Sequence, residues 1–432
     1  MGIVIVGGGV VGLAAAILLK KQNEEVYLIE RDKQLGGLLN SIQMSDGMFL
    51  DFGSHVPRET EIDELDNILF KNLPLEEWNK YSYANVGNFF QGKLNYHSQF
   101  IDVSILPVAT YLNGLKDLLS IEDNLVIDNA EESLKFQFGN TFAKEVYKPL
   151  LNKLFGVRDL NQLEPNSHNL FGYSRMIVAN QEMTEKFKTV SFLDERVAHI
   201  KNSIGASTKS NYYPKSPGIY KWIEHLKKQA LQLGVTVITE DYITELDSVK
   251  KSVLTNKGKK LAYDKLVWTL PKEMLFMLME KKLTVELPEF RGVNIVHFKY
   301  EGQLLTENHY VYCNDSTLKS FRVTLYDNLT NERTSWCSVE VIGEKCKDVS
   351  VLFEELKIMG IIDTYTKCTD VHEIYIKNGF PIPKRKATGV NTEALIPISV
   401  VDIITLNRDA NNFFMEDLLV KMYKKLSSEN MI

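Results

Sequence analysis

The first thirty residues carry the clearest pattern of hydrophobic and polar positions in the chain. A short, continuous apolar run, Gly2–Val6, is typical of a strand that is buried on both faces. After a glycine cluster, Val10–Lys21 is rich in Ala and Leu and has no proline, which favours a helix. A second apolar run, Glu25–Glu30, ends in an acidic residue. This order predicts a strand–helix–strand unit with parallel strands.

The glycines between the first strand and the helix fit the pattern GxGxxG at Gly7, Gly9 and Gly12. In this pattern the first glycine permits a tight turn, the second lets backbone approach a pyrophosphate, and the third lets helix and strand pack closely. The amides at the helix start, at Val10 and Val11, are expected to face the phosphates, because a helix N-terminus carries unpaired N–H groups and partial positive charge. The pattern predicts a dinucleotide site.

An acidic residue stands at the expected distance from these glycines. Glu30 follows Gly7 by 23 residues and closes the second predicted strand. A carboxylate at this point is expected to accept hydrogen bonds from the ribose of an adenosine. A structural glycine turn without a ligand would not require this acid.

The segments that follow distinguish FAD from NAD. They read RDKQLGGLL over residues 31–39 and DGMFLDFGSH over residues 46–55. With Glu30, they resemble the extended fingerprint of the FAD-binding superfamily of amine oxidases, protoporphyrinogen oxidases and UDP-galactopyranose mutases. The resemblance implies an α/β fold: a Rossmann-like FAD domain of the two-dinucleotide-binding-domain type, with an interleaved α+β substrate domain. It also implies non-covalent FAD, since no cysteine lies near the glycine pair or the family's closing motif, which matches Thr405–Lys425.

By the same resemblance, cofactor contacts come from several parts of the chain. Besides the residues above, they are Arg31, Gly36, Gly37, Leu38, Gly53, Ser54, His55, Ile243, Arg408, Phe414 and Met415. The glycine pair would follow the ribityl–phosphate chain, and His55 would lie beside the isoalloxazine. Ile243 is explained equally well as an ordinary core residue. In the closing motif Asn407-Arg408 replaces Gly-Arg, and the run to Met415 is about two residues short.

Later segments predict how the chain is divided. Helices are expected over Glu131–Leu154, with a break at Gly139, and over Ile219–Leu233, which Gly234 would end. Strands are expected over Val235–Leu246 and Asp264–Pro271, and β structure over Phe290–Asn328. By resemblance, the chain leaves and re-enters the FAD domain. The prediction is a discontinuous FAD domain of residues 1–75, 205–280 and 385–432, a helical insertion of residues 76–204 and a β-rich substrate domain of residues 281–384.

Three residues are the candidate catalytic residues: His55, Arg175 and Arg322. The two arginines stand near the places where galactopyranose mutases hold the substrate diphosphate, and an arginine fork can pair two phosphate oxygens. An ordinary salt bridge explains each arginine alone equally well. The substrate tyrosines of the mutases are not matched, because Gly379-Phe380-Pro381 and Phe413-Phe414 replace them. This argues against a galactofuranose-forming enzyme.

The favoured function is therefore an FAD-dependent oxidoreductase that acts on a polar, nucleotide- or lipid-linked sugar in bacterial polysaccharide biosynthesis. Its substrate would be an anionic small molecule. Two alternatives stay open: a non-redox flavoenzyme like UDP-galactopyranose mutase, and a non-catalytic FAD-binding protein. The chain has no second GxGxxG and no CxxC, which disfavours reductases with their own NADPH domain and disulfide reductases.

Composition and net charge limit the classes of partner that the protein is expected to bind. The chain has 432 residues, of which 44% are hydrophobic and 25% charged, as in globular proteins of more than one domain. A net charge of −6 disfavours a nucleic-acid partner. The four cysteines lack the spacing of a metal site, so no bound metal is expected. They also show no disulfide pattern, which fits a reducing cytoplasm. No apolar run is long enough for a transmembrane segment, so a cytoplasmic protein is expected, and its oligomeric state is left open.

Overall fold

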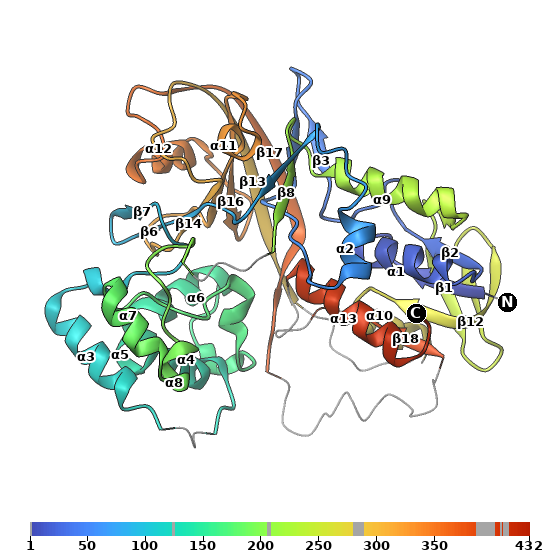
Figure 1. Cartoon of the computed structure of the whole chain (residues 1–432), viewed down its shortest axis with the longest axis horizontal. Helices are drawn as coiled ribbons and strands as arrows, with labels where there is room; N and C mark the ends of the chain where they lie inside the picture. The colour runs from blue at the N-terminus through green and yellow to red at the C-terminus, as the bar shows by residue number, and fades with distance from the viewer. Residues whose placement is uncertain are drawn as a thin grey trace. The chain divides into compact units, whose positions relative to one another are not determined.

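This computed structural model describes residues 2–122, 126–204, 209–279, 289–385, 402–406, 408 and 414–432. The chain divides into two compact units (Figure 1). The first unit comprises Met1–Lys80, Tyr212–Leu287 and Ala387–Ile432, and the second comprises Tyr81–Asn211 and Pro288–Lys386. Both units are therefore assembled from segments that are far apart in the sequence.

A parallel sheet forms the centre of the first unit. Its parallel strands are β9 (Thr236–Ile238), β2 (Val26–Ile29), β1 (Gly2–Val6), β12 (Lys260–Trp268) and β18 (Ile403–Thr405), in this spatial order. β10 (Ile243–Asp247) and β11 (Ser252–Thr255) extend the sheet by antiparallel pairing onto β12. β1 lies between β2 and β12; the chain leaves β1 towards β2, whereas after β12 it re-enters the sheet on the opposite side, as β18. The predicted strand–helix–strand unit is present.

Helices cover the parallel strands. α1 (Val10–Lys21) lies between α9 (Tyr220–Leu233) and α13 (Met415–Ser428), as Figure 1 shows, and α2 (Asp63–Leu69) joins the same core. α9 buries a stripe at helical spacing that includes Trp222, Leu226 and Ala230. It ends where Gly234 adopts a φ of +89°, a conformation that glycine tolerates best. α10 (Lys272–Met279) completes the described helices of this unit.

A buried carboxylate joins a hairpin to the start of α9. The hairpin consists of β3 (Ser41–Gln43) and β4 (Phe49–Asp51). Asp51 is 1% exposed and accepts hydrogen bonds from the Ser41 hydroxyl at 2.7 Å, the Tyr213 hydroxyl at 2.5 Å and the Ile219 amide at 2.7 Å. Burial raises the pKa of Asp51 to about 6, although these three donors act in the opposite direction.

The second unit is built on a seven-stranded sheet. Its strands, in spatial order, are β17 (Lys367–Ile382), β13 (Glu289–Glu301), β16 (Trp336–Ile342), β15 (Arg322–Leu325), β14 (Tyr310–Cys313), β6 (Val86–Phe90) and β7 (Lys93–Asn95). All neighbours are antiparallel except β14 and β6. α12 (Ser350–Ile358) packs its Leu352 and Leu356 against an apolar face of this sheet that includes Phe298 and Val339.

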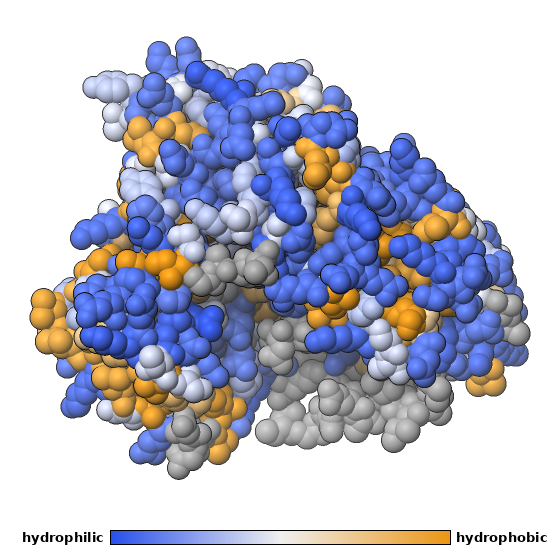
Figure 2. Space-filling view, in the orientation of Figure 1, coloured by the Kyte–Doolittle hydropathy of each residue, from blue (hydrophilic) through white to orange (hydrophobic). Residues whose placement is uncertain are grey.

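Shorter elements complete the second unit. They are α3 (Val108–Leu119), α4 (Ala130–Phe138), α5 (Asn140–Phe142), α6 (Lys148–Phe155), α7 (Gln181–Lys188), α8 (Ser191–Asp194), α11 (Tyr326–Thr330) and the 3-10 turns η1 (Val103–Ile105), η3 (Leu160–Gln162) and η4 (Ser167–Phe171). A π-helical turn, Ala143–Tyr147, joins α5 to α6. β5 (Trp78–Tyr81) and β8 (Asn211–Pro214) form a separate pair, and most of their residues belong to the first unit. In Figure 2, hydrophobic residues gather over α3, where Val108 and Leu112 are exposed. Over the described ranges, no helix is long and apolar enough to cross a bilayer.

Two predicted elements need correction. The strand predicted over Val235–Leu246 is two strands, β9 and β10, because the chain turns between them at Glu240, whose φ is +55°. There the Asp241 amide donates to the Glu30 carbonyl at 3.0 Å. The β structure predicted over Phe290–Asn328 ends earlier, since α11 begins at Tyr326.

The buried Asp51 predicts a specific pH dependence of stability. Its pKa rises from 3.8 in the unfolded chain to about 6 in the folded one, so the folded state favours the protonated acid. This contribution is present at low pH and is lost as the pH rises through the folded pKa. The free energy of unfolding of the wild type, measured relative to Asp51→Asn, should fall by about 3 kcal/mol between about pH 3 and 7. Urea unfolding of both proteins at matched flavin content measures it, and parallel pH profiles would contradict it.

Candidate functional site

The candidate cofactor site lies at the carboxyl edge of the parallel sheet in the first unit. Ligands of open α/β sheets bind where neighbouring strands connect in opposite directions, which here is between β1 and β12. Gly7 follows β1 with a φ of +104°. A side chain there would meet the Thr269 hydroxyl at 2.2 Å, and this hydroxyl donates to the Val6 carbonyl at 2.8 Å. The turn is therefore restricted to glycine.

The other two glycines of the motif have opposite surroundings. A Cβ on Gly12 would lie 2.0 Å from the carbonyl oxygen of Gly7, so α1 approaches its own strand too closely for any side chain. A Cβ on Gly9 would have no atom within 4 Å. Gly9 is the N-cap of α1 and provides no side-chain cap. The Cβ position of Gly9 therefore adjoins open space at the start of α1, where the first amides, at Val10 and Val11, have no intrahelical acceptor, and this arrangement fits a pyrophosphate.

Glu30 shapes this loop and keeps capacity for a ligand. Its Oε2 accepts the Gly8 amide at 2.7 Å, and its Oε1 accepts the Asp32 amide at 2.9 Å. A carboxylate has about four acceptor positions, so each oxygen can also accept a ribose hydroxyl. The sequence pattern indicated the ligand role and missed the structural one. The neighbouring Arg31 is exposed and pairs with Asp32 at 3.3 Å.

The glycine pair lies against the GxGxxG loop. The Gly36 amide donates to the Gly8 carbonyl at 2.8 Å, and the Gly36 Cβ position lies 3.0 Å from Ile223 of α9. Gly37, with a φ of +58°, has open space at its Cβ position, and Leu38 is half-buried. Two motifs separated by more than twenty residues thus meet at one edge of the sheet. These residues are suited to hold FAD.

The turn after β4 contains Gly53, Ser54 and His55. Gly53 has a φ of +100°, and Ser54 is buried. His55 is half-buried, and its Nε2 lies 3.2 Å from the Phe52 carbonyl oxygen. That hydrogen bond requires Nε2 to carry the proton, because a carbonyl can only accept. A place beside the isoalloxazine stays a prediction for His55.

The remaining predicted cofactor residues lie on later elements. Ile243 begins β10, is 7% exposed and pairs with Thr255, as an ordinary core residue does. β18 runs parallel to β12, so the chain after it starts from the same sheet edge as α1. Arg408 is exposed; Phe414 is the N-cap of α13 and Met415 its first residue. Asn407 and residues 409–413 of this motif lie outside the described residues. Cofactor contacts of these residues stay predictions.

In the second unit, one face of the sheet is polar. Residues that pair directly across strands point to the same face. One such row crosses five strands through Glu340, Arg322, Tyr312, Asn88 and Asn95. The adjacent row contains His297, Ser338, Thr324 and Tyr310. The opposite face is the apolar one that packs on α12. This polar face was not among the predicted features, although the alternation in the segment HYVYC signals it.

Arg322 is already paired within this row. Its Nε and Nη2 donate to the two carboxylate oxygens of Glu340 at 2.8 and 2.9 Å, a bidentate geometry. Its guanidinium also lies 5.9 Å from the Tyr312 ring centroid. Burial alone would lower the pKa of Arg322, but Glu340 holds this pKa above its ordinary value. Arg322 is therefore charged, and the carboxylate of Glu340 balances its charge.

Arg175 is held elsewhere in the second unit. Its Nε donates to the Asp194 carbonyl at 3.0 Å, and the side chain is half-buried. Over the described residues it shares no hydrogen-bond partner with Arg322. The structure does not bring the two arginines onto a common partner, so their joint binding of a diphosphate stays a prediction.

The polar face also has buried polar atoms without a partner. Nδ1 of His297 lies 2.5 Å from the Ser338 hydroxyl, while its Nε2 has no partner within the described part of the chain. The Thr324 hydroxyl is likewise unpartnered there. Burial lowers the pKa of His297 to about 3, so the ring is neutral near pH 7. Unpartnered buried groups are costly and are common where water or a ligand binds. The described residues hold no group of three or more His, Cys, Asp or Glu suited to a metal ion.

Comparisons with known proteins agree with this geometry. Residues 5–65 match the family described as NAD(P)-binding Rossmann-like domain. The chain is 33% identical over 163 residues to protoporphyrinogen oxidase 2, chloroplastic/mitochondrial, of Arabidopsis thaliana, a match over 36% of this chain and 32% of that protein. It is 46% identical over 55 residues to an uncharacterized protein in the nifH2 3′ region of Methanothermococcus thermolithotrophicus, of which 52% is covered. The chain thus spans about a third of the length of the first of these curated relatives and about half of the length of the second.

Solved structures resemble the chain over its whole length. Reduced UDP-galactopyranose mutase matches with a TM-score of 0.73 and 17% identity, over 99% of this chain and 94% of that one. Cyclohexylamine oxidase from Brevibacterium oxydans IH-35A matches with a TM-score of 0.63 and 14% identity, over 99% and 98%. The predicted fold class and the resemblance to the amine oxidase, protoporphyrinogen oxidase and UDP-galactopyranose mutase proteins are confirmed.

The contrast between Gly9 and Gly12 predicts two separable effects. Gly9→Ala places a methyl group where the structure has open space, so the stability of the FAD-free protein should stay within about 1 kcal/mol of wild type. The same methyl group should weaken FAD binding at least about tenfold by holding the pyrophosphate away from the backbone. Gly12→Ala, the matched control, should destabilise the FAD-free protein by about 2 kcal/mol or more, because its Cβ clashes with backbone.

Flavin fluorescence titration and chemical unfolding of the FAD-free proteins measure the two effects. Unchanged FAD affinity in Gly9→Ala would contradict the placement of the pyrophosphate at the start of α1. A stable Gly12→Ala protein would contradict the close helix–strand contact.

Proposed function

We propose that this protein is an FAD-dependent oxidoreductase that binds FAD non-covalently at the start of α1 and acts on a polar, anionic, sugar-bearing substrate. The observation that carries the cofactor assignment is the open space at Gly9 beside the carboxylate of Glu30. The helix amides would hold the pyrophosphate and Glu30 the ribose. When bound, FAD supplies two-electron redox chemistry.

The polar face of the second unit supports the substrate class. Its row of Tyr312, Arg322 and Glu340 offers a ring, hydrogen-bond donors and acceptors, which together suit a hydroxylated ring with a charged group. The unpartnered His297 Nε2 and Thr324 hydroxyl add polar groups without protein partners among the described residues. A role in bacterial polysaccharide biosynthesis and a cytoplasmic location stay predictions that rest on the sequence.

A mutase-like, non-redox activity is the second candidate. It is favoured by the full-length match to the mutase fold, with a TM-score of 0.73. Against it, Phe380 and Phe414 occupy the segments in which the mutases carry substrate tyrosines. The two candidates differ in the redox state of the flavin that turnover requires.

The first experiment identifies the flavin and tests for redox turnover. The purified protein should be yellow, and heat or acid should release FAD. Anaerobic mixing with a panel of UDP- and dTDP-sugars should bleach the oxidised flavin. Turnover of a UDP-sugar only after dithionite reduction would support the mutase instead, and tight FAD with neither response would support a non-catalytic binder. A colourless protein that binds NADH would overturn the FAD assignment.

The paired charges of Arg322 and Glu340 allow a test of anion binding. If Arg322 holds the substrate anion, Glu340→Gln should raise UDP affinity by about threefold to tenfold, because it removes the carboxylate that balances the guanidinium. Arg322→Ala should lower UDP affinity about tenfold or more. Calorimetric titration with UDP measures both.

Arg175→Ala, measured in the same titration, distinguishes the contribution of Arg175 to UDP affinity from that of Arg322, since Arg175 has a different hydrogen-bond partner. Loss of UDP affinity in both arginine variants would support joint binding. Unchanged UDP affinity in Glu340→Gln and in Arg322→Ala would show that this ion pair serves the fold alone.

A further inference from the structure

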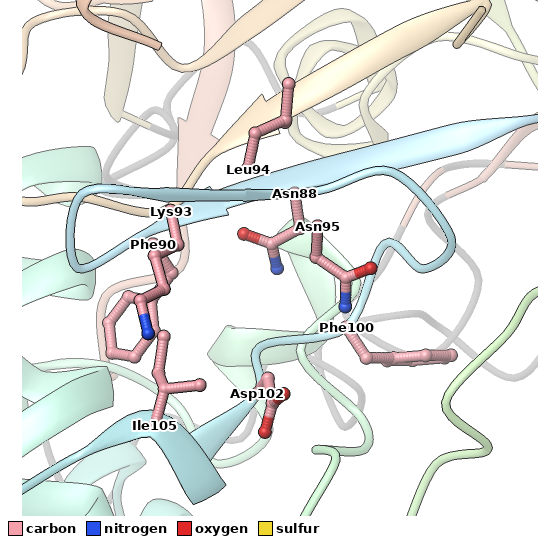
Figure 3. A pocket seen from close by; sticks show the side chains of 8 residues that line it. All are labelled: Asn88, Phe90, Lys93, Leu94, Asn95, Phe100, Asp102 and Ile105. Carbon is pink, nitrogen blue, oxygen red and sulfur yellow. The ribbon is translucent and has the colours of Figure 1, made fainter. Parts of the chain in front are cut away.

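A small cavity opens between a strand pair and a loop of the second unit. It has a volume of about 150 Å³ and lies between β6–β7 and the segment that leads into η1. Its lining residues are Asn88, Phe90, Lys93, Leu94, Asn95, Phe100, Asp102 and Ile105. Figure 3 shows the amides of Asn88 and Asn95 projecting from the strands toward the segment that carries Phe100 and Asp102.

Asn88 presents an unpartnered acceptor at this cavity. The side chain is 2% exposed, and its Nδ2 donates to the Gln99 carbonyl at 3.0 Å. Since a carbonyl can only accept, this bond fixes which end of the amide is the nitrogen. The other end, Oδ1, is buried and has no partner in the described part of the chain. A buried amide oxygen of this kind is satisfied by a donor from a ligand or from water.

Other polar groups of the cavity also have unused hydrogen-bonding positions. Asp102 accepts the Ser104 amide and hydroxyl on Oδ1, at 3.0 and 2.6 Å, and the described residues place no donor on its Oδ2. Asn95 accepts the His97 amide on its oxygen at 2.9 Å, which leaves its amide nitrogen as a donor. The cavity therefore combines acceptors at Asn88 and Asp102 with a donor at Asn95.

Apolar side chains supply the remaining wall. Phe90, Phe100 and Ile105 line the cavity, and Figure 3 shows Phe90 and Ile105 on one side of the two amides and Phe100 on the other. Aromatic rings beside convergent acceptors and donors suit a ligand that is apolar on its ring faces and carries hydroxyl groups at its edges. The volume is below the roughly 300 Å³ at which pockets for larger ligands begin, so it suits one ring and not a nucleoside diphosphate.

We propose that this cavity binds a single neutral sugar ring, with a sugar hydroxyl donating to Asn88 Oδ1 and the ring packing on Phe100. A neutral ligand is favoured because one cation, Lys93, and one anion, Asp102, line the cavity, and their formal charges cancel. Asn88 and Asn95 belong to the strand row that also contains Arg322, so the cavity ends the polar face of the sheet. The inference goes beyond the proposed function, since sugar binding here requires no reaction at the flavin.

The test is sugar binding to the full-length, flavin-loaded protein. Saturation-transfer NMR with D-glucose, D-galactose and N-acetyl-D-glucosamine should detect binding of at least one of them in the millimolar range. The methyl glycoside of the binding sugar distinguishes two sources of the ligand, because its anomeric hydroxyl is blocked as in a glycan. If the methyl glycoside still binds, the natural ligand is the end of a glycan; if it does not bind, the natural ligand is the free sugar. Cyclohexanol, a ring with one hydroxyl, should give a weaker signal than that sugar.

Two variants and a matched control locate the binding. Phe100→Ala removes the ring contact, and Asn88→Leu removes the buried acceptor. Phe100→Ala and Asn88→Leu should each lower sugar affinity about tenfold. Tyr96→Ala, which removes an aromatic side chain that is 43% exposed and outside the cavity lining, should leave it unchanged.

The outcomes separate this inference from the proposed function. Absence of sugar binding, or binding that survives both Phe100→Ala and Asn88→Leu, overturns the sugar site. An equal response to cyclohexanol and to the sugars overturns it as well. Because flavin bleaching is read by absorbance in a separate assay, bleaching without sugar binding at this cavity would leave the oxidoreductase proposal standing.

Discussion

The close contact between α1 and β1 is the constraint on which the first unit depends. The Cβ position of Gly12 lies 2.0 Å from the Gly7 carbonyl oxygen, so the helix begins directly on the end of its strand. This contact places the start of α1 at the sheet edge, where Gly9 faces open space and Glu30 accepts the Gly8 amide. The glycine pair then packs on the same loop through the Gly36 amide. One steric requirement thus organises two separate sequence motifs.

The second unit depends on a different constraint, the alternation of side chains along its strands. Because successive residues of a strand point to opposite faces, β15 places Val323 on the apolar face and Arg322 and Thr324 on the polar one. A shift of one residue in the pairing would exchange the two faces. The bidentate pairing of Arg322 with Glu340 helps to hold the register, because neither charge is easily buried without the other.

The sequence predicted those features whose causes are local. Val10–Lys21 is helical over the predicted residues, and Gly234 ends α9 as expected, because helix propensity and backbone freedom depend on nearby residues. The strand predicted over Val235–Leu246 was wrong, because the turn at Glu240 depends on hydrogen bonds to the chain after β2. The Arg322–Glu340 pair and the Asn88–Asn95 row depend on strand register, which one sequence does not reveal. The roles of His55 and Arg175 toward cofactor or substrate stay predictions.

The balanced charge of Arg322 has a consequence for how an anion could bind the polar face. A buried arginine with a free fork would attract any anion, whereas one paired by two hydrogen bonds offers only its remaining N–H groups. An incoming phosphate must therefore share the guanidinium with Glu340 or displace that carboxylate, and displacement would leave a buried charge without its partner. An arrangement in which the phosphate and Glu340 share the guanidinium is therefore less costly. In that arrangement the geometry of the Arg322–Glu340 pair determines the orientation of the ligand. Selectivity on this face would then come from the uncharged donors and acceptors of the neighbouring row more than from net charge.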